Sequence, residues 1–201
     1  IAGLAFCEQL ERNHKNFIVF DTGVNTSTKV SGGVFNPVVL KRFTLAWMAK
    51  EHMEASIPFY KNLSKKLGTN IFCEIPVLRI LSSVEEQNDW VVASDKLELA
   101  PFLTSTILKN DNQNINAPFG FGKVNTTGRI FPALLLTTYR QYLQKKELLI
   151  SEAFHYDQLS EENNKIVYKG ISAKKILFAE GAAVVHNPFF PKLRPTDKKR
   201  F

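Results

Sequence analysis

The first 21 residues constrain the fold of this 201-residue chain more than any other stretch. Residues 1–10 have the spacing of an amphipathic helix, and a short polar connection then leads to the apolar run 17–20. The expected helix face consists of Gly3, Phe6, Cys7 and Leu10. A run of four apolar residues is too short for a helix and is typical of a strand buried on both faces of a parallel sheet. Asp21 follows it directly, so we expect a carboxylate at the strand's carboxyl end.

The spacing of this unit is close to the later half of the dinucleotide-binding fingerprint. Asp21 lies 18 residues after Gly3, and in the fingerprint an acid about 20 residues on binds the ribose hydroxyl. A glycine at the helix start permits close packing on the strand, and the free N–H groups of the first turn favour a pyrophosphate. The earlier strand and its two glycines do not precede Ile1. Any helix–strand unit that ends in Asp would give the same half-motif.

Composition and charge describe an ordinary globular chain, with 44% hydrophobic and 22% charged residues. The chain is long enough for one large domain or two small ones, and no apolar run approaches the roughly 20 residues that span a bilayer. Neither a signal peptide nor an initiator Met is present, so we expect a fragment of a cytoplasmic protein that has no membrane contact. We interpret the net charge of +7 first as solvent-exposed surface charge. Nucleic-acid binding is a much less favoured interpretation.

The cysteine pattern predicts neither a disulfide nor a metal site. Cys7 and Cys73 lie far apart and have no metal-ligand spacing. Cys7 falls on the expected buried face of the first helix. We therefore expect both to be reduced core residues, and no metal to be bound.

The rest of the chain alternates between parallel α/β patterns and an antiparallel block. Residues 22–37 predict a long loop rich in hydroxyls and glycines, which is either ligand-binding or plainly flexible. Residues 38–67 predict a helix that Pro58 kinks or splits. A helix is also expected after Ser82 and Ser83, and another over 131–145. Strands are expected at 71–73, 77–81, 119–124, 148–150, 166–168 and 176–179.

Four stretches, in this order, resemble the FAD-dependent amino-acid oxidase family, the group of D-amino-acid oxidase and glycine oxidase. Residues 1–4 and 17–21 resemble the end of the glycine motif and the second strand with its acid. Residues 26–37 are similar to the Ser/Gly loop beside the flavin. Residues 128–135 resemble the return from the substrate domain, and residues 177–181 resemble a later segment near the cofactor.

The resemblance implies an α/β fold, with a Rossmann-like FAD-binding domain over 1–69 and 127–185 and an inserted α+β substrate region over 70–126. Residues 186–201 would be a loop or linker. The implied cofactor is FAD and the implied substrate a small amine or amino acid. The implied cofactor-binding residues are Gly3, Asp21, Ser27, Ser31, Gly32, Gly33, Phe154 and Gly181.

Each implied residue has an expected role. Gly3 would let the helix approach the diphosphate, and Asp21 would hold the adenosine ribose, where the family more often has Glu. The Ser/Gly loop would line the flavin, Phe154 would lie where a backbone group meets the adenine, and Gly181 would pass close to the ADP portion. No catalytic residue is assigned, although Arg79 and Arg129 are candidates for pairing with a carboxylate.

Three alternatives remain beside this interpretation. One is a tRNA-modifying FAD oxidoreductase of the same family, which only the net charge supports. Another is an S-adenosylmethionine-dependent methyltransferase, which also places a glycine turn and an acid around its second strand. The last is a non-catalytic relative with a flavin-type fold. Substrate, electron acceptor and oligomeric state are not indicated by the sequence.

Overall fold

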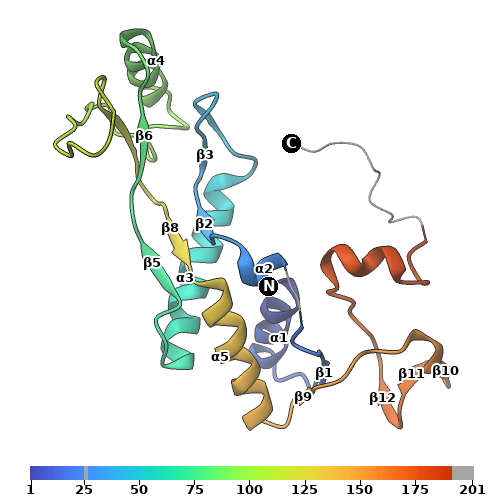
Figure 1. The fold of residues 1–201 in the computed structure, drawn as a ribbon. Helices are drawn as coiled ribbons and strands as arrows, with labels where there is room; N and C mark the ends of the chain where they lie inside the picture. Colours follow the sequence, from blue (N-terminus) through green and yellow to red (C-terminus); the bar gives the residue numbers. More distant parts are fainter. Residues whose placement is uncertain (25–26, 192–201) are drawn as a thin grey trace. The chain divides into compact units, whose positions relative to one another are not determined.

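The computed structural model describes residues 1–24 and 27–191, and these fall into two compact units. The first unit holds residues 1–24 and 139–191, and the second holds residues 27–138. Both contain helices and small sheets, so the fold is mixed α/β, as expected (Figure 1). The expected terminal linker lies largely outside the described residues, since 192–201 are not described. The expected domain boundaries at 69, 126 and 185 stay a prediction.

The first unit opens with α1 (Ala2–Arg12), which confirms the expected helix. Its buried residues are Leu4, Cys7 and Glu8, whereas Phe6 is 44% exposed, so the expected face was partly wrong. Glu8 is buried, and its carboxylate accepts a hydrogen bond of 2.9 Å from the Tyr139 hydroxyl, which partly offsets the cost of removing it from water. Tyr139 lies on α5 (Pro132–Lys145), whose later part belongs to this unit.

A short parallel strand pair follows α1 in the first unit. β1 (Val19–Phe20) pairs in parallel with β9 (Leu149–Ile150), which confirms the expected parallel strand (Figure 1). The strand is shorter than expected, and the expected burial on both faces is wrong, since both of its residues are half-buried. The sheet that contains them has only these two strands among the described residues.

The remainder of the first unit is an antiparallel sheet and two short 3-10 helices. β10 (Leu159–Glu162), β11 (Lys165–Tyr168) and β12 (Ile171–Ala173) pair in sequence order. Before them lies η1 (Tyr156–Gln158), and after them η2 (Gly181–His186). The strand expected at 176–179 is wrong, because these residues form no ladder.

In the second unit, α2 (Ser27–Val30) and β2 (Val34–Phe35) interrupt the stretch that was expected to be an irregular loop. β2 pairs antiparallel with β8 (Gly128–Ile130), and β8 pairs in turn with β5 (Phe72–Glu74). Two segments that lie almost 100 residues apart in the sequence are thereby joined in one sheet, as Figure 1 shows.

The helix expected over 38–67 begins later than predicted. Residues 38–48 instead form a hairpin of β3 (Val38–Val39) and β4 (Thr44–Leu45), followed by α3 (Ala49–Leu67). The prediction failed here because Phe43 and Met48 take left-handed backbone conformations, with φ of 47° and 48°, which interrupt a helix. Pro58 lies inside α3 without splitting it, and Gly68 ends the helix at a φ of 62°, as expected.

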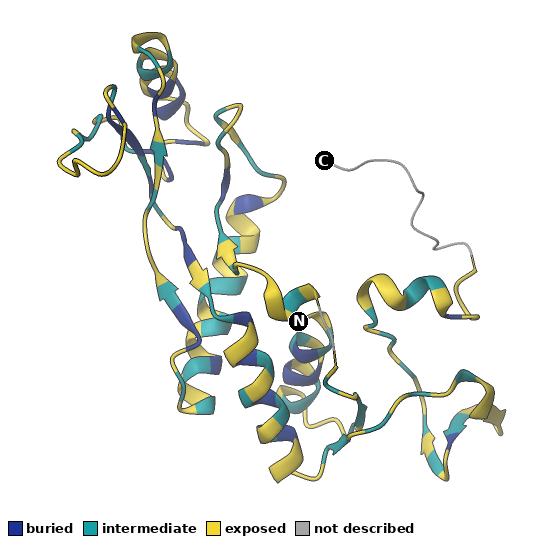
Figure 2. Cartoon of the chain, viewed as in Figure 1, coloured by how far each residue is buried: buried dark blue, intermediate teal, exposed yellow. Residues whose placement is uncertain are grey.

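The main core of the second unit surrounds Trp90. β6 (Val77–Ile80) pairs antiparallel with β7 (Phe121–Val124), and α4 (Val84–Ser94) packs beside them. Ser83 caps α4 by accepting a hydrogen bond from the Glu86 N–H, which confirms the expected cap. Buried residues accordingly gather around α4 and β7 in Figure 2. The cluster comprises Val38, Leu81, Trp90, Ala93, Leu99, Phe102, Leu103 and Val124.

None of the helices in the described ranges is both long enough and apolar enough to cross a bilayer.

Candidate functional site

In the first unit, Gly3 marks a close contact at the start of α1. A Cβ at this position would lie 3.0 Å from the Ala179 Cβ, closer than ordinary van der Waals contact. A larger residue would therefore push the helix start away from the segment that contains Ala179. The close packing expected of Gly3 was on a strand, whereas this contact is with a segment that forms no strand.

Asp21 lies just beyond the carboxyl end of β1, where its carboxylate is held by two donors. The Gly23 N–H donates to Oδ1 at 3.1 Å, and Arg140 forms an ion pair with Oδ2. Arg140 also donates to the Asp21 backbone carbonyl at 2.9 Å and to the Ser151 hydroxyl at 3.3 Å. Because Ser151 follows β9, Arg140 connects the ends of both parallel strands.

Phe154 comes four residues after β9 and lies in an aromatic cluster. Its ring stacks on Tyr168 with centroids 4.2 Å apart, and meets Phe20 and Phe178 edge-on. The cluster therefore connects the strand that precedes Asp21 with the residues that follow β9.

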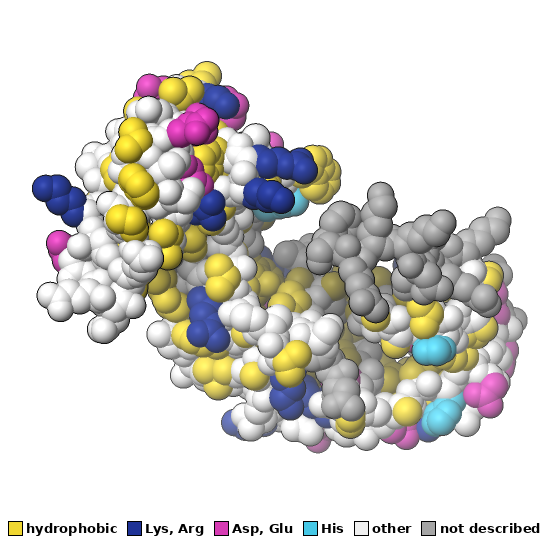
Figure 3. Space-filling view, turned by 45° about the horizontal axis from the view of Figure 1, so that its top comes forward, with side chains coloured by type: hydrophobic (Ala, Val, Ile, Leu, Met, Phe, Trp, Pro, Cys, Tyr) yellow, Lys and Arg dark blue, Asp and Glu magenta, His cyan; other side chains and the backbone are white. Residues whose placement is uncertain are grey.

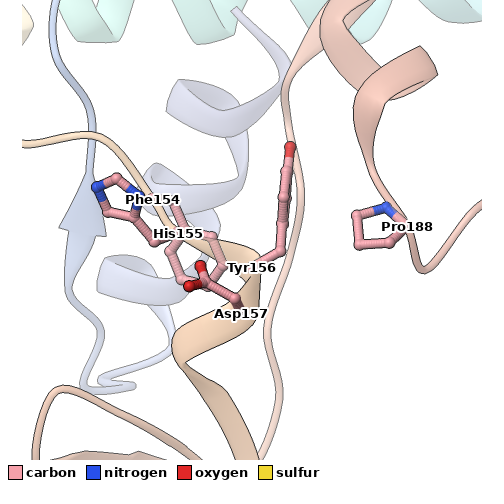
Figure 4. Close-up of a pocket in the computed structure, with 5 residues that line it drawn as sticks. All are labelled: Phe154, His155, Tyr156, Asp157 and Pro188. Carbon is pink, nitrogen blue, oxygen red and sulfur yellow. The ribbon is translucent and has the colours of Figure 1, made fainter.

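An open cavity of about 540 Å³ borders this cluster within the first unit. Figure 4 shows its lining, which includes four consecutive residues around η1 and one residue after η2. The lining residues are Phe154, His155, Tyr156, Asp157 and Pro188. Two aromatic rings, an imidazole and a carboxylate thus border one space, a combination that suits a planar ring with polar edges.

One wall of the cavity is fixed by hydrogen bonds to Glu180. The Tyr156 hydroxyl donates to one oxygen of Glu180 at 2.5 Å, and the Asn187 amide donates to the other at 2.8 Å. Burial and the bond to Glu180 raise the pKa of Tyr156 to about 12. Tyr156 therefore stays protonated at neutral pH and acts as a donor. Gly181, directly after Glu180, has a left-handed φ of 59° and open space around its Cα.

In the second unit, the predicted Ser/Gly loop (residues 31–33) contacts the segment 128–132. The Ile130 N–H donates to the Gly33 carbonyl at 2.9 Å, and a Cβ on Gly33 would lie 2.1 Å from the Ile130 carbonyl oxygen. Gly33 also has a φ of 67°, so only glycine fits there without strain. Gly32 differs, because a Cβ on it would meet nothing within 4 Å. Two of the four stretches behind the family resemblance are thus in contact.

The serines of this loop are placed less specifically. Ser27 is the exposed first residue of α2, and the Ser31 hydroxyl donates to the Thr28 carbonyl at 2.8 Å. Residues 25 and 26, which fall within the loop predicted over 22–37, lie outside the described residues. The structure brings Ser31, Gly32 and Gly33 next to β8, and Gly3, Asp21, Phe154 and Gly181 into the first unit.

The two candidate arginines have different partners. Arg79 forms an ion pair of 2.6 Å with Glu86, whereas Arg129 donates through Nε to the Gly32 carbonyl at 2.9 Å. Burial disfavours the charged form of Glu86, but hydrogen bonds from Ser82 and Arg79 outweigh this and lower its pKa. Arg79 is therefore paired with Glu86, in the first turn of α4.

Sequence patterns missed Arg140, Tyr156 and Glu180. Arg140 lies in an expected helix, but its carboxylate partner is 119 residues away, so no local spacing reveals the pair. The only local signal at Tyr156 was its closeness to Phe154. Across residues 1–24 and 27–191, no group of three or more His, Cys, Asp or Glu side chains is arranged to hold a metal ion.

No protein-family model matches the chain.

Proposed function

We propose that this chain is an FAD-dependent oxidoreductase of the amino-acid oxidase type, which oxidises the C–N bond of an amino acid or amine. In this proposal the mixed α/β fold is Rossmann-like, with an inserted α+β substrate region. The observation that carries the proposal is the parallel pair β1–β9, with Asp21 after one strand and the Phe154 cavity after the other. Ligands of open α/β sheets bind beyond the carboxyl ends of such strands.

The environment of Asp21 suits a ribose. A carboxylate has about four lone-pair sites, and among the described residues Gly23 and Arg140 use two of those of Asp21. The side chain is 44% exposed, which leaves acceptor capacity for hydroxyl groups. Arg140 orients the carboxylate through their ion pair, so Asp21 would accept from the ribose hydroxyls without having to reorganise.

The cavity beside Phe154 suits an adenine ring. Its volume of about 540 Å³ falls within the range of small-molecule sites, roughly 300–1,000 Å³. The rings of Phe154 and Tyr156 offer apolar faces, and Asp157 offers an acceptor for an exocyclic amine. Gly3 would let the start of α1 lie close to Ala179, and Gly181 would border the ADP portion, since a Cβ there would meet no atom within 4 Å.

FAD, when bound, supplies the acceptor for the hydride that leaves the carbon next to the amine nitrogen. The roles of the first unit's own residues are binding and orientation: Asp21 holds the ribose, and Phe154 and Tyr156 exclude water. Tyr156 keeps its proton at neutral pH, and its hydroxyl donates a hydrogen bond to Glu180, which holds the cavity wall in place. No proton-transfer residue is required by this scheme, and none is assigned.

The tRNA-modifying alternative ranks second. It needs a dense basic surface, because phosphate contacts dominate the affinity for nucleic acid. On the face drawn in Figure 3, the Lys and Arg side chains lie in several separate groups. The preferred substrate class in this proposal is a small amine or amino acid, and a cytoplasmic location stays part of the proposal.

The test is the visible absorption spectrum of the purified protein after incubation with FAD and removal of excess. We expect flavin bands near ~370 and ~450 nm, and release of FAD on unfolding. Asp21→Asn should bind FAD more weakly, whereas Asp111→Asn, in an exposed loop of the second unit, should bind as the wild type does. A wild-type protein that stays colourless would refute the proposal and favour the methyltransferase or non-catalytic alternative.

A further inference from the structure

Trp47, which follows the hairpin of β3 and β4 in the second unit, is the most exposed aromatic residue in 1–24 and 27–191. Its side chain is 80% exposed, and its ring meets that of His52 edge-on, with centroids 5.5 Å apart. Trp90, in the same unit, is completely buried. Because tryptophan carries the largest apolar surface of any residue, an indole left in water forgoes the stabilisation that Trp90 gains. The exposure of Trp47 therefore needs an explanation outside the core.

The hairpin that precedes Trp47 is fixed to the core by one of its two faces. Val38 is 4% exposed, and Leu45, its partner across the ladder, packs against the core cluster. At the turn, the Phe43 ring meets the indole of Trp90 edge-on, with centroids 5.3 Å apart. The side chains that the hairpin exposes are thus held on a rigid support.

The other face and the ends of the hairpin are exposed. Val39, which points away from the face that holds Val38, is 41% exposed, and Met48, next to Trp47, is 44% exposed. Arg42 and Trp47 are five positions apart, so their Cα atoms lie within about 18 Å of each other, and one flat partner could contact both. We name the exposed residues of this element the hairpin surface: Val39, Lys41, Arg42, Trp47, Met48 and Lys50.

The charged residues of the hairpin surface are all basic. Lys41 and Arg42 lie in the turn, and Lys50 lies in the first turn of α3. None of these three has an ion pair with an acid in the part of the chain that the structure describes. Three cations and one acid, Glu51, lie within 38–51, a net charge of +2. In Figure 3, Lys and Arg side chains adjoin hydrophobic side chains and a histidine at one corner of the face drawn.

This combination of side chains matches the surface of an anionic bilayer. Tryptophan is favoured at the level of the lipid headgroups, where its apolar body and its N–H are both satisfied. A Lys or Arg close to an anionic bilayer strengthens binding by about fivefold. A single-stranded nucleic acid would instead need a positively charged groove along several nucleotides, and the apolar chains of Val39 and Met48 offer it no phosphate contact.

We propose that the hairpin surface binds the headgroup region of an anionic membrane. Trp47 and Met48 enter the headgroup layer, and the three cations contact the lipid phosphates. The contact is with the bilayer surface and needs no spanning helix. It departs in this respect from the prediction of no membrane contact that the sequence gave rise to. The inference does not rest on the proposed function, since neither FAD nor the first unit takes part in it.

The decisive experiment measures binding of the full chain to vesicles of phosphatidylcholine that contain about 30% phosphatidylserine. Wild-type protein should sediment with these vesicles and bind pure phosphatidylcholine at least about tenfold more weakly. The triple variant Lys41→Gln, Arg42→Gln, Lys50→Gln should bind the anionic vesicles about 100-fold more weakly. The matched control replaces three exposed lysines elsewhere in the second unit and has the same net charge, so it should keep most of the affinity. Its substitutions are Lys65→Gln, Lys96→Gln and Lys109→Gln.

The apolar part of the hairpin surface has its own variant and control. Trp47→Ser should bind the anionic vesicles about tenfold more weakly, because the indole no longer enters the headgroup layer. Leu97→Ser removes a side chain that is 90% exposed elsewhere in the same unit, and it should bind as the wild type does. Equal losses in these two variants, or in the two triple variants, would overturn the inference.

Tryptophan fluorescence reports insertion without a separation step. Emission of the wild-type protein should shift to shorter wavelength when anionic vesicles are added, because Trp47 leaves water, whereas buried Trp90 gives a constant background. The shift should be absent in Trp47→Phe. Failure of the wild type to bind anionic vesicles, or binding without this shift, would overturn the inference. So would tighter, Trp47-dependent binding of a single-stranded oligonucleotide than of the vesicles, which would assign the hairpin surface to nucleic acid.

Discussion

The indole ring of Trp90 occupies the space in which a side chain on Gly122 would have to stand. A Cβ on Gly122 would lie 2.3 Å from Cε2 of Trp90, and Trp90 is completely buried. The indole N–H donates to the Thr104 carbonyl at 2.9 Å, so the ring cannot move aside without losing this bond. β7 and α4 are therefore in contact through a glycine backbone and an aromatic face.

Replacement of Gly122 by Ala should destabilise the second unit. The added methyl group overpacks a well-filled core, and we expect a loss of about 1–3 kcal/mol in the free energy of unfolding. Urea denaturation followed by tryptophan fluorescence measures this loss. Gly32→Ala is the control and should be neutral or slightly stabilising, because the methyl group meets no atom within 4 Å. Equal effects of the two substitutions would contradict the packing described around Trp90.

The ion pair of Asp21 and Arg140 should contribute a small, salt-dependent coupling energy. Asp21 is more than a third exposed, so solvent screens the pair, and a double-mutant cycle with Asp21→Asn and Arg140→Gln should give about 0.5–1 kcal/mol. The coupling should fall on going from low salt to 0.5 M NaCl. A coupling of zero at low salt would mean that the pair does not form in solution.

Cys7 should react slowly with thiol reagents until the solution is strongly alkaline. Burial, with the neighbouring Glu8 carboxylate, raises the pKa of the Cys7 thiol to about 11. Only about one thiol in a thousand is then ionised at pH 8, and the thiolate is the nucleophile. In Cys73→Ser, where Cys7 is the remaining thiol, the iodoacetamide rate should rise about tenfold per pH unit toward pH 11.

The same shift gives Cys7 a pH-dependent effect on stability. The thiolate of Cys7 is disfavoured in the folded state. The contribution of Cys7 to the free energy of unfolding is therefore fully present below the pKa of the thiol in the unfolded chain, and it is lost as pH rises toward 11. Cys7→Ser, in which Cys73 is the remaining thiol, is the control for both the iodoacetamide rate and the pH dependence of stability. In 6 M urea the two single-thiol variants should react with iodoacetamide at the same rate. If the rate of Cys7 in the folded protein had its midpoint near pH 8.5, that result would argue against the burial of Cys7.

Pro58 should weaken α3. It lies inside the helix and has no N–H to donate to the Glu54 carbonyl, so Pro58→Ala restores one backbone hydrogen bond. We expect a net gain of about 1–2 kcal/mol, smaller than the full helix penalty because the proline also restricts the unfolded chain. Pro132→Ala should change stability in the opposite direction, since Pro132 is the first residue of α5, where proline is favourable. Far-UV circular dichroism during urea unfolding gives both values.

Local chemistry explains what the sequence predicted correctly. Ser83 was expected to cap a helix because its hydroxyl can accept an orphan N–H, and it accepts that of Glu86. Glycines in residues 119–124 were expected to face something large, and Gly122 faces Trp90. These signals are contained within a few residues, so no knowledge of the tertiary structure is needed to read them.

Contacts between distant residues explain what the sequence did not predict. The hairpin at 38–48 depends on left-handed conformations at Phe43 and Met48, residue types that give no such signal. The run 176–179 is apolar enough for a strand, but it packs into the aromatic cluster through Phe178 and pairs with no strand. The partner of Asp21 lies on a helix 119 residues later, and the cavity beside Phe154 requires Pro188 from far along the chain.

The pairing of β1 with β9 also sets an order of events during synthesis. Val19 pairs with Leu149, so β1 cannot form its parallel pair until about 130 more residues have been synthesised. This takes roughly 6–26 seconds at ordinary elongation rates. Residues 27–138 are contiguous and are complete before β9 emerges from the ribosome. The second unit can thus fold while β1 is still unpaired, and until β9 is made the strand edge of β1 has no partner in the first unit's parallel pair.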